Sequence, residues 1–465
     1  MHQLLRAGIA LALASLAATS ASGASRFLQD PYPSTYRAPP SEPVLIHNAT
    51  VLTGTGERLD DADVLLRDGK VEAVGRGLQA GSEVRRIDAR GRWVTPGLID
   101  VHSHLGVYPS PGVSAHSDGN EMTAPVTANV WAEHSVWPQD PGFAEALAGG
   151  VTSMHILPGS ANLVGGRGVT LKNVATTTYQ AMKFPGAPWG LKMACGENPK
   201  RVYGGKGTAP GTRMGNVAGY RAAFIDASEY IAKNSPKPRR GWFGGDRGDS
   251  AGDAGGKRDL KLDTLAGAIE GDIRVHIHCY RADEMATMLD LADEFGFKVA
   301  AFHHAVEAYK LADRLAEEGV CGALWADWWG FKMEAFDGVQ ENIALVDRPA
   351  NSCAVVHSDS PEGIQRLNQE AAKAMAAGRR AGMAPILPER AITWVTSNAA
   401  KALGIEEQTG SLEPGKMADV VVWNGNPFSS YALADQVFID GHRHYDRTTP
   451  GAKPVSDFRL GQEVP

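Results

Sequence analysis

The sequence predicts an α/β fold, a (β/α)8 TIM-like barrel with a small β-sandwich domain formed by both chain ends. Alternating apolar runs that end in His or Asp recur through the middle of the chain, and amphipathic stretches such as 282–294 lie between them. This alternation of strand and helix is typical of a parallel sheet. Blocks with strand patterning flank this region on both sides. A chain of 465 residues is long enough for one barrel and a smaller domain.

The first 24 residues have the pattern of a secretory signal peptide. Arg6 precedes an apolar run from 7 to 18, and small residues follow up to Ala24, after which cleavage is expected. The apolar run is too short to span a bilayer comfortably. We therefore expect a secreted or periplasmic protein without a membrane span in the mature chain. Residues 25–42, which contain four prolines, are predicted to be a linker.

The two ends of the remaining chain are each patterned as strands. Residues 44–87 carry a hairpin signal at Asp68-Gly69, and residues 410–444 carry another at Asp440-Gly441. Neither block alone has enough strands to bury an apolar face. We expect them to form one β-sandwich. The predicted domains are therefore 43–95 and 410–447 for the sandwich, 96–409 for the barrel and 448–465 for a tail.

The most informative motif is His102-Ser103-His104, at the end of the first predicted barrel strand. Residues i and i+2 of a strand share a face, so both imidazoles can reach one point above the strand. Borderline divalent ions such as zinc accept imidazole nitrogens. Alone the motif is weak evidence, because structural or exposed histidines give the same pattern.

Three later runs with strand patterning also end in residues that bind metals. They end at His278, at His303-His304 and at Asp359. In parallel barrels the functional groups lie at the C-terminal ends of the strands, so we expect these side chains to meet the first motif at one place.

Two-residue alternation sorts some of the remaining histidines. His276 lies about 6.6 Å deeper in its strand than His278 and is predicted to be an interior residue. His357, two residues before Asp359, is predicted to be a hydrogen-bonded interior histidine. Adjacent strand residues point in opposite directions, so only one of His303 and His304 is expected to face the barrel interior. Both faces of that run are apolar, so the pattern does not choose between them.

With these motifs the chain resembles the amidohydrolase superfamily, in its imidazolonepropionase-like and metal-dependent prolidase-like branch. The resemblance covers residues 43 to about 446. Its motifs are the segment 94–104, Gly150-Val151-Thr152-Ser153, His304-Ala305-Val306-Glu307, His357-Ser358-Asp359, the segment 398–404 and the segment 410–422. One departure is Ala399, where the family more often has proline.

The resemblance implies two divalent metal ions, expected to be zinc. It places His102, His104 and Asp359 on one ion and His278 and His304 on the other, with His304 chosen by the family's His-x-x-Glu spacing. A bridging ligand is expected from the fourth strand. Lys192, as a carboxylated lysine, is favoured by its position; Glu197 is the alternative, because it lies nearer the strand end and needs no modification.

This ligand set implies hydrolysis of an amide or other non-terminal C–N bond by a metal-activated water, with Asp359 as the proton acceptor and donor. Expected substrates are N-acyl amino acids, dipeptides or cyclic amides. Expected substrate contacts are Arg167, Arg201, Tyr203 and Arg281, and Arg167 is equally a candidate loop anchor. The alternatives are a mononuclear deaminase, a lactonase or phosphotriesterase of the same superfamily, and a non-catalytic metal-binding exported protein.

Charge and cysteine content bound the remaining properties. The net charge of -7, with both signs interspersed, offers no basic patch, so no nucleic-acid partner is expected. We expect a small-molecule or short peptide substrate, and a homo-oligomer is compatible with the sequence. The four cysteines are expected to be buried free thiols, although export would permit disulfides. They are Cys195, Cys279, Cys321 and Cys353.

Overall fold

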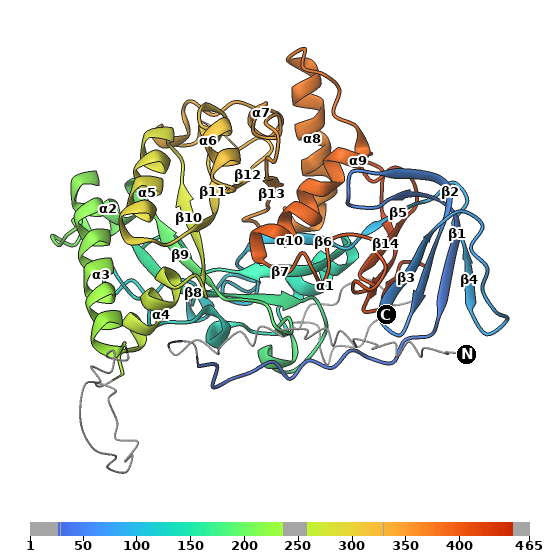
Figure 1. Cartoon of the computed structure of the whole chain (residues 1–465), viewed down its shortest axis with the longest axis horizontal. Coiled ribbons are helices and arrows are strands. Elements are labelled where there is room, and N and C mark those ends of the chain that lie inside the picture. Colours follow the sequence, from blue (N-terminus) through green and yellow to red (C-terminus); the bar gives the residue numbers. More distant parts are fainter. Residues whose placement is uncertain (1–26, 28, 236–257, 329, 450–465) are drawn as a thin grey trace, which may run out of the picture.

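The computed structural model describes residue 27, residues 29–235, 258–328 and 330–449 (Figure 1). The predicted signal peptide, residues 1–24, and nearly all of the predicted tail lie outside this part. The chain forms two sheets, which lie side by side in Figure 1. One is the barrel sheet, which is surrounded by helices, and the other forms the smaller domain. Among the described residues, no helix is long and apolar enough to cross a membrane.

Strands from both ends of the chain form the smaller domain, as predicted. They are β1 (Val44–Leu52), β2 (Arg58–Arg67), β3 (Lys70–Gly75), β4 (Arg85–Asp88), β5 (Trp93–Pro96), β14 (Val420–Trp423), β15 (Ala434–Ile439) and β16 (His442–Asp446). They belong to one continuous sheet, in the order β16-β15-β14-β5-β1-β2-β3, with β4 also paired to β1. The antiparallel pairing of β5 with β14 joins the two ends, and Val51, Val94 and Val422 share its apolar core.

The hairpin turns of this domain follow the sequence signals. Asp68 and Gly69 both have positive φ values, 50° and 76°, between β2 and β3. Asp440 and Gly441 do the same between β15 and β16, at 47° and 72°. Two consecutive positive φ values are what a tight turn between right-twisted antiparallel strands requires, and Asp-Gly adopts them readily.

The barrel sheet has eight strands in sequential order. They are β6 (Leu98–Ser103), β7 (Val151–Ile156), β8 (Val164–Lys172), β9 (Gly190–Ala194), β10 (Arg274–Cys279), β11 (Val299–His304), β12 (Cys321–Leu324) and β13 (Ala354–Val356). Seven strands run in one direction, whereas β8 is antiparallel to β7 and β9. The reason is the short connection between β7 and β8, residues 157–163, which contains no crossover helix; a parallel pair needs a dozen or more connecting residues.

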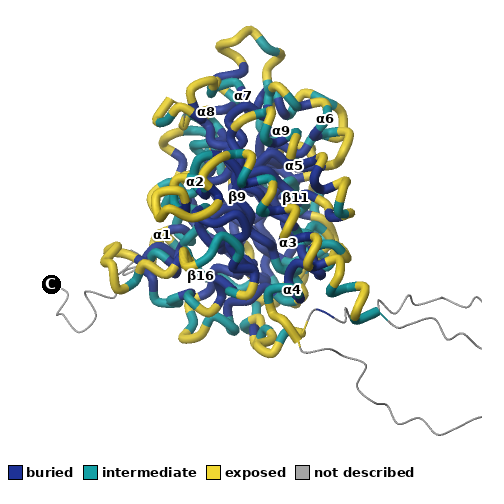
Figure 2. Tube along the Cα trace, turned by 90° about the vertical axis from the view of Figure 1, so that its left-hand side faces the viewer, coloured by how far each residue is buried: buried dark blue, intermediate teal, exposed yellow. Residues whose placement is uncertain are grey.

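Helices surround the barrel strands, which are almost entirely buried, as Figure 2 shows for β9 and β11. The α-helices are α1 (Pro141–Ala148), α2 (Glu197–Gly204), α3 (Arg213–Asn234), α4 (Leu260–Ile269), α5 (Ala282–Phe295), α6 (Ala312–Glu317), α7 (Asn342–Val346), α8 (Leu367–Arg380), α9 (Pro388–Ala391) and α10 (Ser397–Leu403). Short 3-10 helices are η1 (Ser114–His116), η2 (Ala132–Ser135), η3 (Tyr179–Ala181), η4 (Ala308–Lys310), η5 (Met333–Ala335), η6 (Ile364–Arg366) and η7 (Ile392–Val395). The predicted amphipathic stretch 282–294 matches α5, which ends at the left-handed Gly296.

The described residues of the predicted linker pack against the rest of the protein (Figure 1). Tyr36 is buried, and its hydroxyl donates a hydrogen bond to Asp440 Oδ2 at 2.5 Å. The Thr35 N–H donates to Gln180 O at 3.0 Å, and the Ser34 hydroxyl donates to Lys183 O at 2.7 Å. Aromatic side chains in a proline-rich segment were the available signal, because their burial stabilises a docked conformation.

The prediction of free thiols is wrong, because all four cysteines form disulfides. Cys195, just after β9, pairs with Cys279 at the end of β10, and their Cα atoms are 5.1 Å apart. Cys321, at the start of β12, pairs with Cys353, just before β13, with Cα atoms 4.5 Å apart. Both bridges join neighbouring parallel strands. The register explains the first, since the Cys195 N–H donates to His278 O at 2.8 Å and thereby brings the two cysteines level.

Candidate metal centre

The ends of β6 and β13 bring three candidate ligand atoms together. The Nε2 atoms of His102 and His104 are 3.3 Å apart, and Asp359 Oδ1 lies 3.5 Å from the first and 3.2 Å from the second. Ligands about 2.1 Å from a tetrahedral ion lie roughly 3.4 Å from one another. The three atoms therefore have the spacing of one face of a metal coordination sphere, and an imidazole, imidazole and carboxylate set suits a borderline divalent ion.

Backbone geometry at the end of β13 places the carboxylate. The N–H of Asp359 donates to the carbonyl oxygen of His102 at 3.1 Å, so the last strand is joined to the first just below the site. Asp359 itself has φ of 52°. A non-glycine residue in this left-handed region costs about 1–3 kcal/mol, and such residues cluster at functional sites.

The two imidazoles at the end of β6, those of His102 and His104, are each oriented through their other nitrogen. His104 Nδ1 donates to the carbonyl oxygen of Leu157 at 2.9 Å. His102 Nδ1 lies 2.9 Å from Nδ1 of His303, a residue of β11. Both contacts leave the Nε2 atoms directed at Asp359.

His303 and His304 both lie in the barrel interior, so the expectation that only one of them would do so is wrong. The φ values of His304 and Ala305 are 67° and 38°, which ends the strand alternation at His304. The His304 ring is consequently 4.8 Å from the His102 ring, although His303 also contacts His102. A left-handed turn at a strand end carries no clear sequence signal when the residue is histidine.

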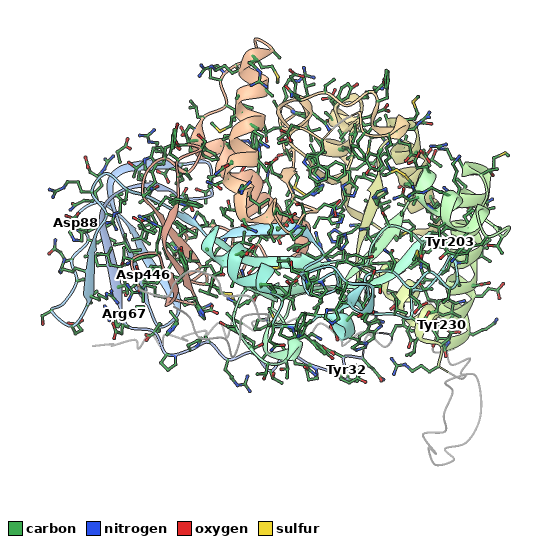
Figure 3. All side chains as sticks on the ribbon, turned by 180° about the vertical axis from the view of Figure 1, so that it is seen from behind. Tyr32, Arg67, Asp88, Tyr203, Tyr230 and Asp446 are labelled. Atoms are coloured by element: carbon green, nitrogen blue, oxygen red, sulfur yellow. A yellow bond between two sulfur atoms is a disulfide. The ribbon has the colours of Figure 1, made fainter. Side chains whose placement is uncertain are left out.

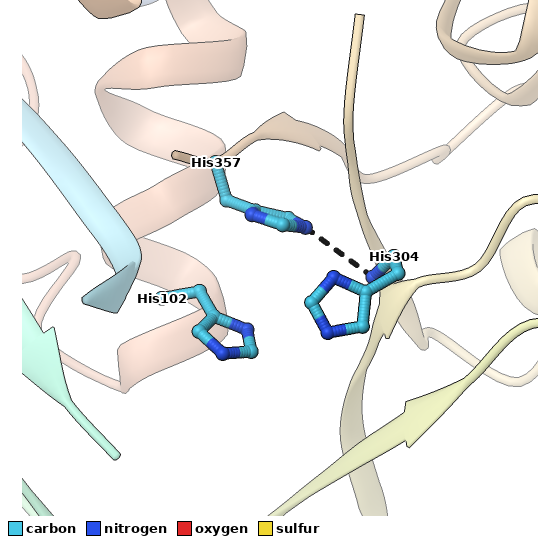
Figure 4. A group of neighbouring side chains, drawn as sticks. All are labelled: His102, His304 and His357. Carbon is cyan, nitrogen blue, oxygen red and sulfur yellow. Dashed lines mark hydrogen bonds between the residues drawn. The ribbon is translucent and has the colours of Figure 1, made fainter. Parts of the chain in front are cut away.

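His357 joins His304 at the centre of the barrel, as Figure 4 shows. Its Nε2 accepts a hydrogen bond from the His304 N–H at 3.3 Å, which agrees with the predicted hydrogen-bonded interior histidine. It also offers a ligand atom within 4.8 Å of those of His102 and His304, so these three form a second candidate group. His357 was not among the ligands predicted from the sequence.

His278, at the end of β10, lies beside His304 with their ring centroids 4.6 Å apart. Its Nε2 is 3.3 Å from Nδ2 of Asn198. The Nδ1 atoms of His278, His304 and His357 are buried and have no hydrogen-bond partner among the described residues. Buried polar atoms without partners are rare in folded proteins and are accounted for when an ion occupies the site. The residues present therefore fit a metal.

Comparisons with known proteins agree with this geometry. A model of the Amidohydrolase family matches residues 334–454. A crystal structure of an amidohydrolase from Thermotoga maritima MSB8 is 35% identical and superposes with a TM-score of 0.77 over 87% of this chain and 100% of that chain. The chain belongs to the amidohydrolase superfamily.

Curated relatives match over different lengths. Amidohydrolase tasK of Hapsidospora irregularis is 33% identical over 446 residues, which are 89% of this amidohydrolase and 44% of tasK. The chain thus spans less than half the length of that relative. A D-hydantoinase of Geobacillus stearothermophilus is 48% identical over 62 residues, 13% of this chain and 12% of that enzyme.

Of the two bridging candidates, the amidohydrolase barrel brings Lys192 to the histidines. Lys192 lies on β9, is 1% exposed, and places Nζ 3.3 Å from His102 Nε2. Burial lowers its pKa to about 8, against the opposing charge of Asp359. Glu197 instead begins α2, a quarter of its side chain is exposed, and its carboxylate is 3.4 Å from Lys332 Nζ.

The surroundings of the candidate ligands favour the protonation states that bind metals, namely neutral imidazoles and an ionised carboxylate. Burial, followed by the nearby Lys192 for two of them, holds the pKa values of His102, His278 and His304 well below 6.5, so these imidazoles are neutral and able to bind a metal. Burial alone would raise the pKa of Asp359. The contacts with His104, His357 and Lys192 together outweigh burial and lower that pKa, which keeps the carboxylate ionised at neutral pH.

Two of the four expected substrate contacts, Arg167 and Tyr203, are buried among other partners. Arg167 is buried on β8, where it pairs in register with Leu191 and so faces away from Lys192; its Nε donates to Thr264 Oγ1 at 2.8 Å and its guanidinium lies over Trp131. This placement favours the loop-anchor alternative. Tyr203, on the flank of the barrel (Figure 3), donates to Ala124 O at 2.6 Å.

The two remaining arginines are exposed on the surface. Arg281 pairs with Asp283 at 2.9 Å, and Arg201 lies on α2. An aromatic wall beside His304 is a feature that sequence reasoning missed. Trp325 stacks on His304 with ring centroids 4.1 Å apart, and Tyr280 stacks on it at 5.5 Å. Both aromatics directly follow barrel strands, at Leu324 and Cys279, which was the available signal.

Proposed function

We propose that the protein is an exported, metal-dependent hydrolase that cleaves an amide or other non-terminal C–N bond of a small molecule or short peptide. The observation that carries this proposal is the triangle formed by His102, His104 and Asp359, with edges of 3.2–3.5 Å. Membership of the amidohydrolase superfamily supports it, as do the matches to relatives named D-hydantoinase and dihydroorotase.

We propose two divalent ions, zinc being the expected metal. His102, His104 and Asp359 would hold one ion, and His278 and His304 would hold the other. Lys192, carboxylated at Nζ, would join them; its pKa of about 8 leaves a neutral amine fraction at neutral pH that can react with carbon dioxide. When bound, such ions polarise a carbonyl group and lower the pKa of water toward about 7.

The residues of the chain then supply binding and proton transfer. Asp359, 22% exposed at its side chain and ionised, accepts the proton of the attacking water at a carboxylate oxygen and returns it to the leaving nitrogen. Trp325 and Tyr280 cover the His304 side of the site, which limits the access of bulk water there. The substrate enters from the side on which Asp359 is exposed.

Export is supported by the disulfides. Two bridges among the described residues suit a protein that folds in an oxidising compartment, and such bonds are rare in reducing cytosol. The signal pattern of residues 1–24 supplies the route. We therefore propose a secreted or periplasmic location. Mass spectrometry of the extracellular and periplasmic fractions tests it by detecting a chain that begins after Ala24.

The central experiment combines metal analysis with substrate profiling. The mature protein is loaded with zinc, its metal content is measured, and hydrolysis is followed for N-acyl amino acids, dipeptides and cyclic amides, with lactones, phosphotriesters and aminopurines as competing classes. We expect two ions per chain and turnover of a C–N substrate. Full activity with one tightly held ion contradicts the binuclear centre, and preferred turnover of a competing class contradicts the proposed reaction.

A further inference from the structure

Below the candidate metal ligands, the barrel core contains three more histidines. His303, His276 and His155 are each no more than 1% exposed. His303 Nδ1 is 2.9 Å from His102 Nδ1, and His303 Nε2 is 2.9 Å from His276 Nδ1. The His276 and His155 rings are 5.0 Å apart, and His155 Nδ1 lies 3.0 Å from Thr170 Oγ1. We call His102, His303, His276 and His155 the histidine column.

Ordinary core packing does not account for the histidine column. The interior of such a barrel is usually filled by branched aliphatic side chains, and burying imidazole nitrogens is unfavourable unless they form hydrogen bonds. The sheet also makes room for the lowest ring, because a Cβ at Gly190 or Gly168 would lie 2.3 Å or 2.7 Å from His155 Nε2. Two glycines and three polar rings therefore occupy space that apolar side chains would fill more favourably.

Two contacts of the histidine column, His102 Nδ1 to His303 Nδ1 and His303 Nε2 to His276 Nδ1, each join ring nitrogens 2.9 Å apart, so in each of them one nitrogen must donate and the other must accept. A neutral imidazole has one donor nitrogen and one acceptor nitrogen. These two hydrogen bonds therefore fix the tautomers from His102 as far as His276; beyond it the rings are only packed together, since His276 Nε2 and His155 Nε2 have no hydrogen-bond partner among the described residues.

The donor and acceptor of each hydrogen bond in the histidine column follow from the role of His102, the ring nearest the candidate metal centre. His102 Nε2 faces His104 and Asp359, so it must present a lone pair when a metal is held, and the proton of His102 is then on Nδ1. His303 Nδ1 must accept that proton's hydrogen bond, which leaves His303 Nε2 to donate to His276 Nδ1. With the opposite direction, His102 would carry its proton on Nε2 and could not bind.

We propose that the histidine column is a tautomer relay in which His303 and His276 are positioning residues that hold the lone pair of His102 Nε2 toward the metal. This inference rests on the proposed function, since it needs a metal at His102. His104 shows the contrast, because it is oriented by the carbonyl oxygen of Leu157, which can only accept. His102 is oriented by a side chain able to donate or accept, so the tautomer of His303 decides whether the ligand is ready.

Variants of His303 separate hydrogen bonding from packing. His303→Leu removes the acceptor at Nδ1, whereas His303→Asn keeps an acceptor oxygen near that place. Phe302→Leu is the matched control, because Phe302 is a fully buried apolar residue of the same strand. Metal affinity is measured by chelator competition and thermal stability is measured on the metal-free proteins. Loss of a partner that orients a metal ligand typically weakens affinity about 10–100-fold.

We expect His303→Leu to weaken the affinity for the more tightly bound ion by about 10–100-fold. The metal affinity of His303→Asn should stay within about threefold of that of the unmodified protein. Phe302→Leu should lose thermal stability without losing metal affinity. Equal affinity in His303→Leu, or equally weak binding by the Leu and Asn variants, overturns the relay. Nitrogen NMR of the unmodified zinc-loaded protein gives a second test that does not depend on variants folding. A proton on His303 Nε2 supports the relay, and a proton on His303 Nδ1 overturns it.

These outcomes are distinguishable from failure of the proposed function. If the affinities follow the expected order but no C–N substrate is hydrolysed, the proposed function fails and the relay stands. If a C–N substrate is hydrolysed and His303→Leu binds metal normally, the relay fails and the proposed function stands.

Discussion

The two halves of the candidate metal centre differ in how completely the fold assembles them. At the ends of β6 and β13, the ligand atoms of His102, His104 and Asp359 are already 3.2–3.5 Å apart. At the ends of β10 and β11, His278 and His304 touch through their rings, at 4.6 Å, but His304 Nδ1 lies 3.9 Å from Asp359 Oδ2. Within the described residues, His278 belongs to neither group of clustered ligand atoms.

The second ring nitrogens of the histidines explain the difference. In the first half, His102 Nδ1 lies 2.9 Å from His303 Nδ1, and His104 Nδ1 donates to Leu157 O at 2.9 Å. In the second half, the Nδ1 atoms of His278 and His304 have no hydrogen-bond partner among the described residues. A ring with a hydrogen-bonded second nitrogen is held in one orientation, whereas a ring without one is less constrained. We infer that the first half binds its ion more tightly and that the bridge completes the second.

Asp359→Asn should give the largest effect, because it removes the proton acceptor while keeping the shape and one coordinating oxygen. We expect kcat to fall by a factor on the order of 10² to 10⁴, the range for loss of a general acid or base. Steady-state kinetics and metal content are measured on the same sample, so that lost occupancy is not mistaken for lost chemistry. Near-normal hydrolysis by the fully loaded variant would remove Asp359 from the mechanism.

Lys192→Ala tests whether the second half depends on the bridge. We expect the first ion to remain and the second to be lost, because Lys192 is the bridging candidate whose Nζ lies 3.3 Å from His102 Nε2, whereas Glu197 pairs with Lys332. The affinity for the second ion should fall by more than the roughly 10–100-fold typical of an outer partner. Short carboxylic acids should restore part of the loading and activity by replacing the carbamate.

Glu197→Ala is the matched control for the bridge. Because Glu197 pairs with Lys332 at 3.4 Å, we expect this variant to keep two ions and most of its activity. The opposite pattern, with two ions in Lys192→Ala and one in Glu197→Ala, would assign the bridge to Glu197. Both variants are compared by elemental analysis after identical dialysis.

The contrast between the two halves also shows what the sequence could predict. Strand-end positions of His102, His104, His278 and Asp359 follow from two-residue alternation, since each closes an apolar run. The joint inward placement of His303 and His304 does not, because it needs a φ of 67° at His304 that alternation does not contain. The histidine column was missed for the same reason, since His303 was assigned to the other face once His304 was chosen.

Two further features could not be predicted from the sequence: the alignment of neighbouring strands and the direction of β8. The pairing of Cys195 with Cys279 depends on how β9 and β10 align, and spacing along the chain carries no information on alignment. The antiparallel direction of β8 depends on the connection of seven residues, 157–163, which is too short for a crossover helix. In both cases the deciding contact lies between strands, where a single sequence gives little guidance.

The pH dependence of the stability of the metal-free protein tests whether the histidines buried in the barrel are neutral in the folded state. Burial lowers the pKa values of His155 and His357 to about 3, below the ordinary 6.5 of the unfolded chain. Between these pH values the unfolded chain binds protons that the folded chain does not, so stability is present near neutral pH and falls as the pH decreases. Each histidine should lower the free energy of unfolding by about 1.4 kcal/mol per pH unit below about 6.

Urea midpoints of the metal-free protein at pH 7, 6 and 5 measure this dependence. The zinc-loaded protein is the comparison, since bound metal adds stability at neutral pH that is lost when the ligands are protonated. A midpoint of the metal-free protein that does not change from pH 7 to pH 5 would mean that these histidines are hydrated or protonated in the folded state.

Arg167→Lys should have the smallest effect on catalysis, because Arg167 lies outside both halves. Its register partner is Leu191, and its guanidinium lies 4.3 Å from the Trp131 ring centroid and 4.9 Å from that of Trp189, on the face of β8 opposite Lys192. Lysine keeps the charge but loses the planar stacking and the hydrogen bond to Thr264, so the free energy of unfolding should fall by about 1–3 kcal/mol. We expect KM and metal content to change less than twofold. A large rise in KM without a loss of stability would instead show that Arg167 binds the carboxylate of the substrate. In that case β8 would contribute a residue to the substrate-binding site.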